Sequence, residues 1–463
     1  MTRIHRRSMV VMMNNPMRKT PLLKELLTLS LPIMASNLLQ TMYNMVDAYF
    51  LGKLGKEAIS APSIVFNISN FIIVFGTAFT VAGTTMLSQS YGADKENRQR
   101  LDFLSSQVFV VNTIMSLFVL IVGITLAHPL LTLMQVPSGL TYHYTYQYMT
   151  ITFLAMPLLF GDLILRGILQ GVGDSLTPLY IQLVAVILNV ILDPIFIFVF
   201  KLEVAGAAWA TLLARFVSCL LSFYILFKGS KGVKVRPSLF KPHRPTLILM
   251  SKIGLPAAIG QSLSSLGFAV IQGVVNSFGP AVIAAFGVGN RVQSIFNMPG
   301  QGISQGVAIM VGNKLGEQQE KEAEKVVNVG LWLIGVFITF GMILVLIYGR
   351  YIILFFVNDY EVVHYGLEMF KYTTISVLFF SLYTVALGAF QGGGRTRAIM
   401  LLNVFRLWGL RVPLSYLLPL VFKMGTTGVW IGMLTSNVVV TVWSLILYKR
   451  GSWKVTLELD VHK

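Results

Sequence analysis

The chain has 463 residues, of which 55% are hydrophobic and only 12% are charged. An average soluble domain is about one quarter charged, so this composition excludes a soluble enzyme. The net charge of +17 comes from 36 lysines and arginines against 19 acids. In a soluble protein this excess would indicate nucleic acid binding, but basic loops on the cytoplasmic side of a membrane explain it better. The single cysteine, Cys219, excludes an intrachain disulfide framework.

Apolar stretches of membrane-spanning length recur along the whole chain. A span needs roughly 20 apolar residues, so there is room for about twelve spans with short loops. We predict an all-α polytopic membrane protein with spans at 28–51, 61–88, 104–127, 143–164, 176–200, 205–227, 254–278, 282–313, 326–349, 364–389, 398–421 and 427–448. Most basic residues then fall in the loops on one side, and the loops on the other side hold only Lys53, Lys56, Lys201, Arg350 and Lys423. This asymmetry predicts that both termini are cytoplasmic.

The two halves of the chain repeat each other. Three pairs of positions share one offset along the chain, namely Leu31-Pro32 with Leu255-Pro256, Gly55 with Gly279, and Gly92 with Gly316. A fourth pair, 170–173 with 391–394, has nearly the same offset. A constant offset across several loops is a strong signal of internal duplication. Because six spans return the chain to the same side, the halves are parallel repeats. Secondary transporters commonly build a substrate site between such repeats.

The duplication predicts two six-helix bundles around a central cavity. The predicted segments are a basic cytoplasmic tail over 1–27, an N-lobe over 28–227, a cytoplasmic linker over 228–253, a C-lobe over 254–448 and a cytoplasmic tail over 449–463. The stretch 1–27 lacks the compact apolar region and small-residue cleavage site of a signal peptide.

The sequence carries no motif for ATP-driven transport or for metal-dependent catalysis. It has no GxxxxGK[ST] phosphate loop, and its six histidines lie at tails, loops or span ends without metal-ligand spacing. We therefore expect no cofactor. The absence of such motifs also disfavours a membrane-embedded enzyme.

Two carboxylates lie deep in predicted spans of the first half. Asp47 lies in the first span, and Asp193 lies in the fifth, directly before a proline. Ionisable residues inside spans are expensive and indicate an ion or substrate pathway. Asn189 precedes Asp193 by four residues, so both side chains lie on one face of the helix. Thr211 lies in the otherwise apolar sixth span. These oxygens suit a proton or a hard ion such as sodium; structural ion pairs or interhelical hydrogen bonds are the alternative.

The second half lacks matching acids. The stretch that corresponds to the fifth-span acid reads Arg411-Val-Pro413, and Arg291, Arg406 and Arg411 lie inside predicted spans. Long basic side chains often reach toward lipid head groups, which is the plainer interpretation of these arginines. Asp162, near the end of the fourth span, is interpreted as a loop or interface charge. The predicted cation chemistry therefore belongs to the first half.

These features together resemble the multidrug and toxic compound extrusion (MATE) transporters. The resemblance rests on the two six-span repeats, the Leu-Pro pair near the start of each, Asp-x-x-Phe-Leu-Gly at 47–52, and Gln-Gly-x-Gly after the fourth and tenth spans. Within the family, the chain resembles the prokaryotic DinF-like branch. The NorM-like branch also has acids in the seventh and tenth spans, whereas here the seventh has none and the tenth has only Glu368.

The resemblance implies a cation-coupling cluster and a substrate cavity in the N-lobe. The matching residues are Asp47, Asn189, Asp193, Thr211 and Tyr43. A coupling sodium ion would lie at the first four of these, and Pro32 would lie in a helix that bends. The implied activity is export of amphipathic organic cations in exchange for protons or sodium by alternating access, in the inner (plasma) membrane of a prokaryote. The implied partners are these cations and membrane lipids, without nucleic acid.

A flippase of a lipid-linked oligosaccharide or another lipid is the alternative function. Such flippases share a similar two-lobed fold, and the arginines of the second half leave a pyrophosphate-binding cavity open. The acids of the first half and the count of about twelve spans favour the exporter.

Overall fold

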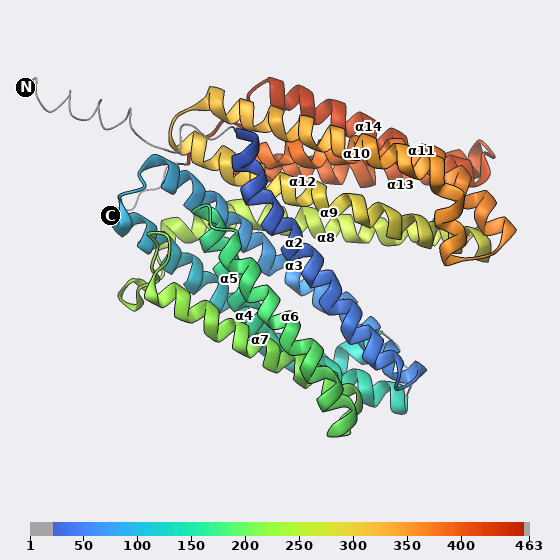
Figure 1. Ribbon diagram of the computed structural model, residues 1–463, viewed down its shortest axis with the longest axis horizontal. Helices are drawn as coiled ribbons and strands as arrows, with labels where there is room; N and C mark the ends of the chain where they lie inside the picture. Colours follow the sequence, from blue (N-terminus) through green and yellow to red (C-terminus); the bar gives the residue numbers. More distant parts are fainter. Residues whose placement is uncertain (1–21, 135, 137, 458–463) are drawn as a thin grey trace, which may run out of the picture.

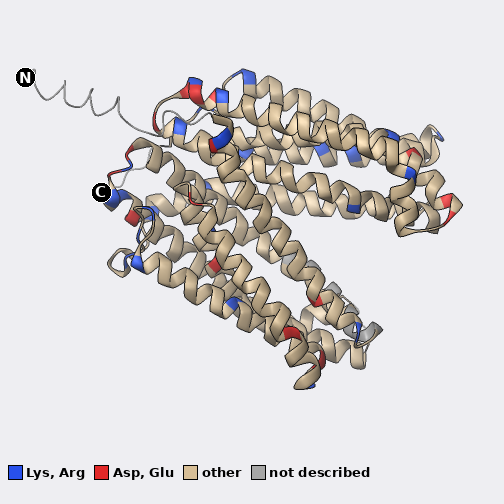
Figure 2. Cartoon of the chain, in the orientation of Figure 1, with Lys and Arg blue, Asp and Glu red and all other residues tan. Residues whose placement is uncertain are grey.

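The computed structural model describes residues 22–134, 136 and 138–457, apart from several side chains between 56 and 71. Over these residues the chain forms twelve helical segments of membrane-spanning length and no β-strand. Eleven of them are also apolar enough to cross a membrane. The predicted all-α polytopic fold is therefore confirmed. Figure 2 shows the charged residues mostly near the helix ends, with few along the middle of the bundles.

The first six segments form the N-lobe. They are α2 (Leu22–Gly52), α3 (Lys56–Ala93), α4 (Arg98–Leu133), α5 (Leu140–Gly171), α6 (Leu176–Pro194) with its π-helical continuation η2 (Ile195–Val199), and α7 (Glu203–Lys228). A short 3-10 helix, η3 (Pro237–Leu239), lies in the linker to the second lobe.

The second six segments form the C-lobe. They are α8 (Arg244–Asn276), α9 (Pro280–Gly316), α10 (Glu320–Phe356), α11 (Tyr360–Gly392), the composite helix α12 (Thr396–Val404), η4 (Phe405–Arg411), α13 (Val412–Tyr416) and η5 (Leu417–Val421), and α14 (Gly425–Lys449). In Figure 1 the two lobes meet at the end where α2 begins and α14 ends, and they diverge toward the opposite end. We call these the closed end and the open end.

The helices are longer than the predicted spans. Residues 22–27 of the predicted tail belong to α2, and residues 244–253 of the predicted linker belong to α8. Hydropathy marks only the part of a helix that lies in hydrocarbon, whereas a helix can continue into water with polar residues. Residues 1–21 lie outside the described part of the chain. Helix α9 is long enough to span a membrane but carries amide side chains along its length, and many of its residues are buried against neighbouring helices.

The backbone repeats between the lobes as the sequence does. Gly55 and Gly279, which precede α3 and α9, have positive φ angles of 127° and 95°, a conformation that favours glycine. The π-helical segments η2 and η5 occupy corresponding places in the two lobes, each shortly before the last helix of its lobe. Next to each, a glycine allows close backbone contact. A Cβ at Gly206 or at Gly428 would lie 2.7 Å from backbone atoms of η2 or η5.

The lobes meet at the closed end through a symmetric crossing of α3 and α9. A Cβ at Gly92 would lie 2.0 Å from the carbonyl oxygen of Asn313, and a Cβ at Gly316 would lie 2.0 Å from that of Gln89. Gln89 and Asn313 are themselves related by the same sequence offset as the two glycines. The Gln89 Nε2 also donates to the carbonyl oxygen of Gly392 at 2.7 Å. Only glycine permits such close helix contact.

Segments outside the helices also dock at the closed end. In the linker, the backbone N–H of Lys234 and the Nε of Arg236 donate to the carboxylate of Asp102 on α4, at 2.7 and 2.6 Å. After α14 the chain returns between the lobes, where the N–H of Leu457 donates to Gln89 Oε1 at 2.7 Å. The closed end is therefore held by helices, by the linker and by the segment after α14.

Candidate functional site

A cavity of about 630 Å³ lies inside the N-lobe, between α2, α3, α5 and α7. Apolar residues from these helices form much of its wall. Its polar and charged lining residues include Tyr43, Asp47, Tyr148, Asp162, Arg166, Thr211 and Arg215. The cavity therefore holds charges of both signs within the membrane-spanning part of the lobe.

Asp47 reaches the cavity from α2, four residues after Tyr43 on the same helix face. Its side chain is 8% exposed. The Tyr148 hydroxyl of α5 donates to Asp47 Oδ2 at 2.9 Å. The other carboxylate oxygen, Oδ1, is buried without a hydrogen-bond partner among the described residues. A buried oxygen without a hydrogen-bond partner is normally satisfied by a bound proton, a cation or a water molecule.

Asp193 lies at the end of α6, where the helix changes from α to π geometry after Pro194. It is fully buried. Asn189 Nδ2 donates to Asp193 Oδ1 at 2.8 Å and to Thr211 Oγ1 at 3.4 Å. In the described structure, Asp193 Oδ2 and Asn189 Oδ1 are buried without a partner. This cluster thus offers two more free oxygens of the type that suits a proton or sodium.

The structure brings the five residues of the predicted cluster together from α2, α6 and α7. Tyr43, Asp47 and Thr211 line the cavity, and Asn189 connects Asp193 to Thr211. The juxtaposition follows from the helix packing, because the three helices are adjacent in the N-lobe (Figure 1).

Pro32 lies on the part of α2 that crosses to the C-lobe. On either side of it, Ser30 and Met34 pack against glycines of α9. A Cβ at Gly306 would lie 2.2 Å from Ser30 Oγ, and one at Gly302 would lie 2.2 Å from Met34 Cγ. The helix is continuous through Pro32. One half of α2 thus contacts the C-lobe, and the other half carries the cavity residues of the N-lobe.

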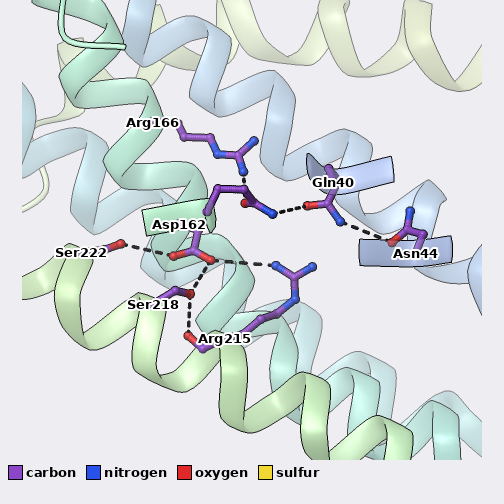
Figure 3. A network of polar contacts seen from close by, with 8 residues as sticks. Gln40, Asn44, Asp162, Arg166, Arg215, Ser218 and Ser222 are labelled. Carbon is purple, nitrogen blue, oxygen red and sulfur yellow. Dashed lines mark hydrogen bonds and ion pairs between the residues drawn. The ribbon is translucent and has the colours of Figure 1, made fainter. Parts of the chain in front are cut away.

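Figure 3 shows a second polar network on the cavity wall. Asp162 of α5 accepts hydrogen bonds from Ser218 at 2.9 Å and Ser222 at 3.2 Å, both on α7, and Arg215 lies 3.9 Å away. The interpretation of Asp162 as a loop or interface charge was wrong, because α5 continues to Gly171 and buries the carboxylate inside the lobe. The position of Arg215 inside a predicted span was the available sequence signal.

A chain of amides continues this network toward α2. Arg166 donates to Gln182 Oε1, and Gln182 Nε2 donates to Gln40 Oε1 at 3.3 Å. Gln40 Nε2 then donates to Asn44 Oδ1 at 3.4 Å. These contacts join α5, α6 and α2 (Figure 3). The sequence alone does not mark these amide side chains or the Tyr148 donor as functional, because single polar residues at helical spacing are common in membrane helices.

The arginines of the C-lobe behave differently from the expectation of side chains that reach the lipid surface. Arg406 and Arg411 are each only 3% exposed. Arg411 donates to Ser436 Oγ at 3.0 Å and to Asn437 Oδ1 at 2.6 Å, both on α14. The Arg406 guanidinium lies 4.9 Å from the centre of the Phe380 ring. That interpretation is corrected for these two residues, because their composite helix turns them toward α11 and α14.

Comparison with known proteins identifies the family. A family model described as MatE matches residues 32–195 and 256–417, one stretch in each lobe. The probable multidrug resistance protein YpnP of Bacillus subtilis (strain 168) is 28% identical over 433 residues, 93% of this chain and 96% of the relative. The multidrug export protein MepA of Staphylococcus aureus (strain MSSA476) is 26% identical over 432 residues, 93% and 94% of the two chains.

The fold comparison agrees with the sequence comparison. A solved structure described as the outward-facing conformation of a multidrug resistance MATE family transporter matches with a TM-score of 0.86 and 22% identity. The match covers 95% of this chain and 98% of that one. Members of this family are transporters rather than enzymes. The chain is a multi-pass membrane protein and belongs to the MATE family.

Proposed function

We propose that this chain exports amphipathic organic cations in exchange for protons or sodium ions by alternating access. The observation that carries the proposal is a pair of buried carboxylates with free oxygens beside a cavity of about 630 Å³. That volume lies within the range of pockets for drug-sized ligands. The multidrug names of its relatives support the substrate class.

The charges of the site supply a rule for exchange. When Asp47, Asp162 and Asp193 are ionised, they outnumber Arg166 and Arg215 by one, and the site attracts a cation. When protons or sodium ions neutralise Asp47 and Asp193, the two arginines outnumber the remaining acid by one. The cationic substrate is then repelled. Substrate and coupling ion thus compete for the same negative charge, which is the requirement of an antiporter.

The membrane potential is large enough to drive such an exchange. When two protons or sodium ions enter for each monovalent cation that leaves, one net elementary charge moves inward, and moving it across 100 mV is worth about 2.3 kcal/mol. This free energy corresponds to a concentration ratio of roughly fiftyfold.

The two-ended architecture supports alternating access. We infer that the closed end faces the cytoplasm, in agreement with the basic residues of the predicted cytoplasmic loops, and that the membrane is the inner membrane of a prokaryote. Helix α2 contacts the C-lobe near Pro32 and carries Tyr43 and Asp47 in the N-lobe. Proline removes one backbone hydrogen bond and favours bending. A bend at Pro32 would therefore couple the ion site to separation of the lobes.

The test is efflux of a fluorescent organic cation from proteoliposomes that contain the purified chain. A proton gradient or a sodium gradient is imposed separately, and the Asp193→Asn variant is compared with wild type. We expect one of the two gradients to drive efflux in the wild type. In the Asp193→Asn variant, the rate of this efflux should be at least tenfold lower. The matched control is Glu361→Gln, which removes an exposed acid at the start of α11. Its rate should equal that of the wild type.

Three results would contradict the proposal. Folded wild-type protein that moves no cationic dye under either gradient would exclude this class of substrate. Efflux that ignores both gradients, or that survives fully in the Asp193→Asn variant, would exclude coupling at this cluster.

A further inference from the structure

A groove of about 460 Å³ opens between α8 and α12, away from the N-lobe cavity. Its basic lining residues are Lys252 and Arg397, and both side chains are exposed. Its apolar lining residues include Leu255, Ile259 and Met400, which follow the basic residues along the two helices. Helix α8 begins at the closed end, so the charges lie near that end and the apolar residues lie deeper.

Two contacts between α8 and α12 fix the shape of this groove. Thr396 Oγ1 donates to the carbonyl oxygen of Ile253 at 2.6 Å. Each of these residues is the chain neighbour of one basic residue, so the contact brings Lys252 and Arg397 to the same level. Deeper in the groove, about two turns along α8 and one turn along α12, a Cβ at Gly260 would lie 3.1 Å from Met400 Cα. The helices therefore meet there, and the groove closes below its basic mouth.

The exposed charges and apolar walls suit one class of ligand. Among the described residues, neither Lys252 nor Arg397 forms an ion pair. On α8, Ile248, Leu255 and Ile259 are 44–47% exposed along one face. A phosphodiester needs positive donors at the membrane surface, and an acyl chain needs apolar walls below them. We propose that this groove binds an anionic phospholipid, with its phosphate at Lys252 and Arg397 and an acyl chain along Leu255 and Ile259.

The repeat supplies an internal comparison. The offset of the Leu-Pro pairs places Thr28 of the N-lobe at the position of Lys252. The offset of the Gln-Gly-x-Gly motifs places Leu176 at the position of Arg397. Neither N-lobe residue can carry a positive charge. The basic pair is therefore not a by-product of the duplicated scaffold, and the site is expected in the C-lobe alone.

The test measures thermal stability of the purified, delipidated chain in neutral detergent and needs no transport. Phosphatidylglycerol, phosphatidylcholine with the same acyl chains, and glycerol phosphate are added separately. We expect phosphatidylglycerol alone to raise the Tm. In the double variant K252Q/R397Q, the apparent affinity for phosphatidylglycerol should fall about thirtyfold, because each basic residue near a membrane surface contributes about 1 kcal/mol.

Two further double variants make the outcome specific. K252R/R397K keeps both charges and should keep the phosphatidylglycerol response, even if K252Q/R397Q melts lower on its own. K321Q/R450Q removes two exposed charges at the same end outside the groove and should also keep it. An equal loss in K321Q/R450Q would overturn the proposal in favour of diffuse charge. Equal protection by phosphatidylcholine or by glycerol phosphate would overturn it in favour of general lipid coating or a free phosphate site.

Discussion

The fifth membrane-spanning helix of each lobe carries a buried acid in the N-lobe and buried arginines in the C-lobe. In the N-lobe, Asp193 at the end of α6 is bonded to Asn189, which also contacts Thr211 on α7. In the C-lobe, the composite helix α12 buries Arg411, which is bonded to Ser436 and Asn437 on α14. The charge is reversed although the π-helical segments and the glycine contacts repeat.

This difference shows that the repeated backbone does not determine which charges each lobe carries. The repeat is kept by apolar packing and by glycines at close contacts, which depend on shape and not on charge. Charges inside the membrane are tolerated only where local partners surround them. A duplicated scaffold can therefore place an ion site in one lobe and a fixed positive cluster in the other.

The largest expected effect concerns the symmetric part of the comparison, the crossing of α3 and α9. Gly92→Ala and Gly316→Ala each place a Cβ 2.0 Å from a backbone oxygen. Overpacking of this kind costs about 1–3 kcal/mol or more, so the state with a closed crossing should become about fivefold to more than a hundredfold less populated, and dye efflux should fall accordingly. The measurement is efflux from proteoliposomes at equal amounts of folded protein.

The control for this pair is Gly335→Ala on α10, where the nearest atom would be 3.9 Å away. Its efflux should match the wild type. Strongly unequal losses in Gly92→Ala and Gly316→Ala would show that the crossing is not functionally symmetric.

The next effect concerns the reversed charges. Arg411→Gln removes the guanidinium donor of Ser436 Oγ and leaves Asn437 Oδ1 with only the longer bond from Arg406 at 3.4 Å, which costs about 1–3 kcal/mol. We expect a lower Tm, measured by thermal unfolding in detergent, with the same coupling ion as the wild type. Asp193→Asn should give the opposite pattern, with coupling lost and stability kept. If Arg411→Gln changed which gradient drives efflux, coupling would be shared between the lobes.

A smaller effect should come from the hydroxyl that bonds Asp47. Tyr148→Phe removes the 2.9 Å hydrogen bond to Asp47 Oδ2 and keeps the ring. One hydrogen bond to a buried group contributes about 0.5–1.5 kcal/mol, so the rate of gradient-driven efflux should fall by up to about tenfold. Tyr146→Phe, which alters a more exposed tyrosine of the same helix, is the matched control. Equal rates in the two variants would exclude a role for the Tyr148 hydroxyl.

The smallest effect belongs to a surface ion pair of the C-lobe, which corresponds to the pair of Arg236 with Asp102 in the N-lobe. Lys454, after α14, lies 2.6 Å from Glu324 and 3.3 Å from Glu320 of α10. Lys454→Gln should lower stability by less than about 1 kcal/mol. The hydrogen bond to Glu324 raises the pKa of Lys454. Its contribution is therefore present at neutral pH and is lost as the pH rises through the folded-state pKa of Lys454.

The measurement is the difference in Tm between the wild type and Lys454→Gln, taken at low and at high salt. Salt screens exposed pairs, so the difference should shrink as the salt concentration rises. A difference that grew with salt would contradict an electrostatic origin.

The amino-acid sequence by itself determined the membrane class, the succession of helices and the duplication. Long apolar runs have one stable form in lipid, because every backbone group must be bonded within its own helix. The sequence also marked Asp47 and Asp193, because a charge inside such a run is costly and stands out. These signals are local, and they are readable without knowing how the helices pack.

Only the tertiary structure decided what each polar side chain meets. It joined Tyr148 to Asp47 on a helix far away in the sequence, buried Asp162 beside α7, and turned Arg406 and Arg411 into the C-lobe. The rotation of a helix about its axis depends on its neighbours, and a shift of one residue turns a side chain by about 100°. The direction in which a side chain points is therefore set by helix packing, and this direction decides which charged residues come together in a site.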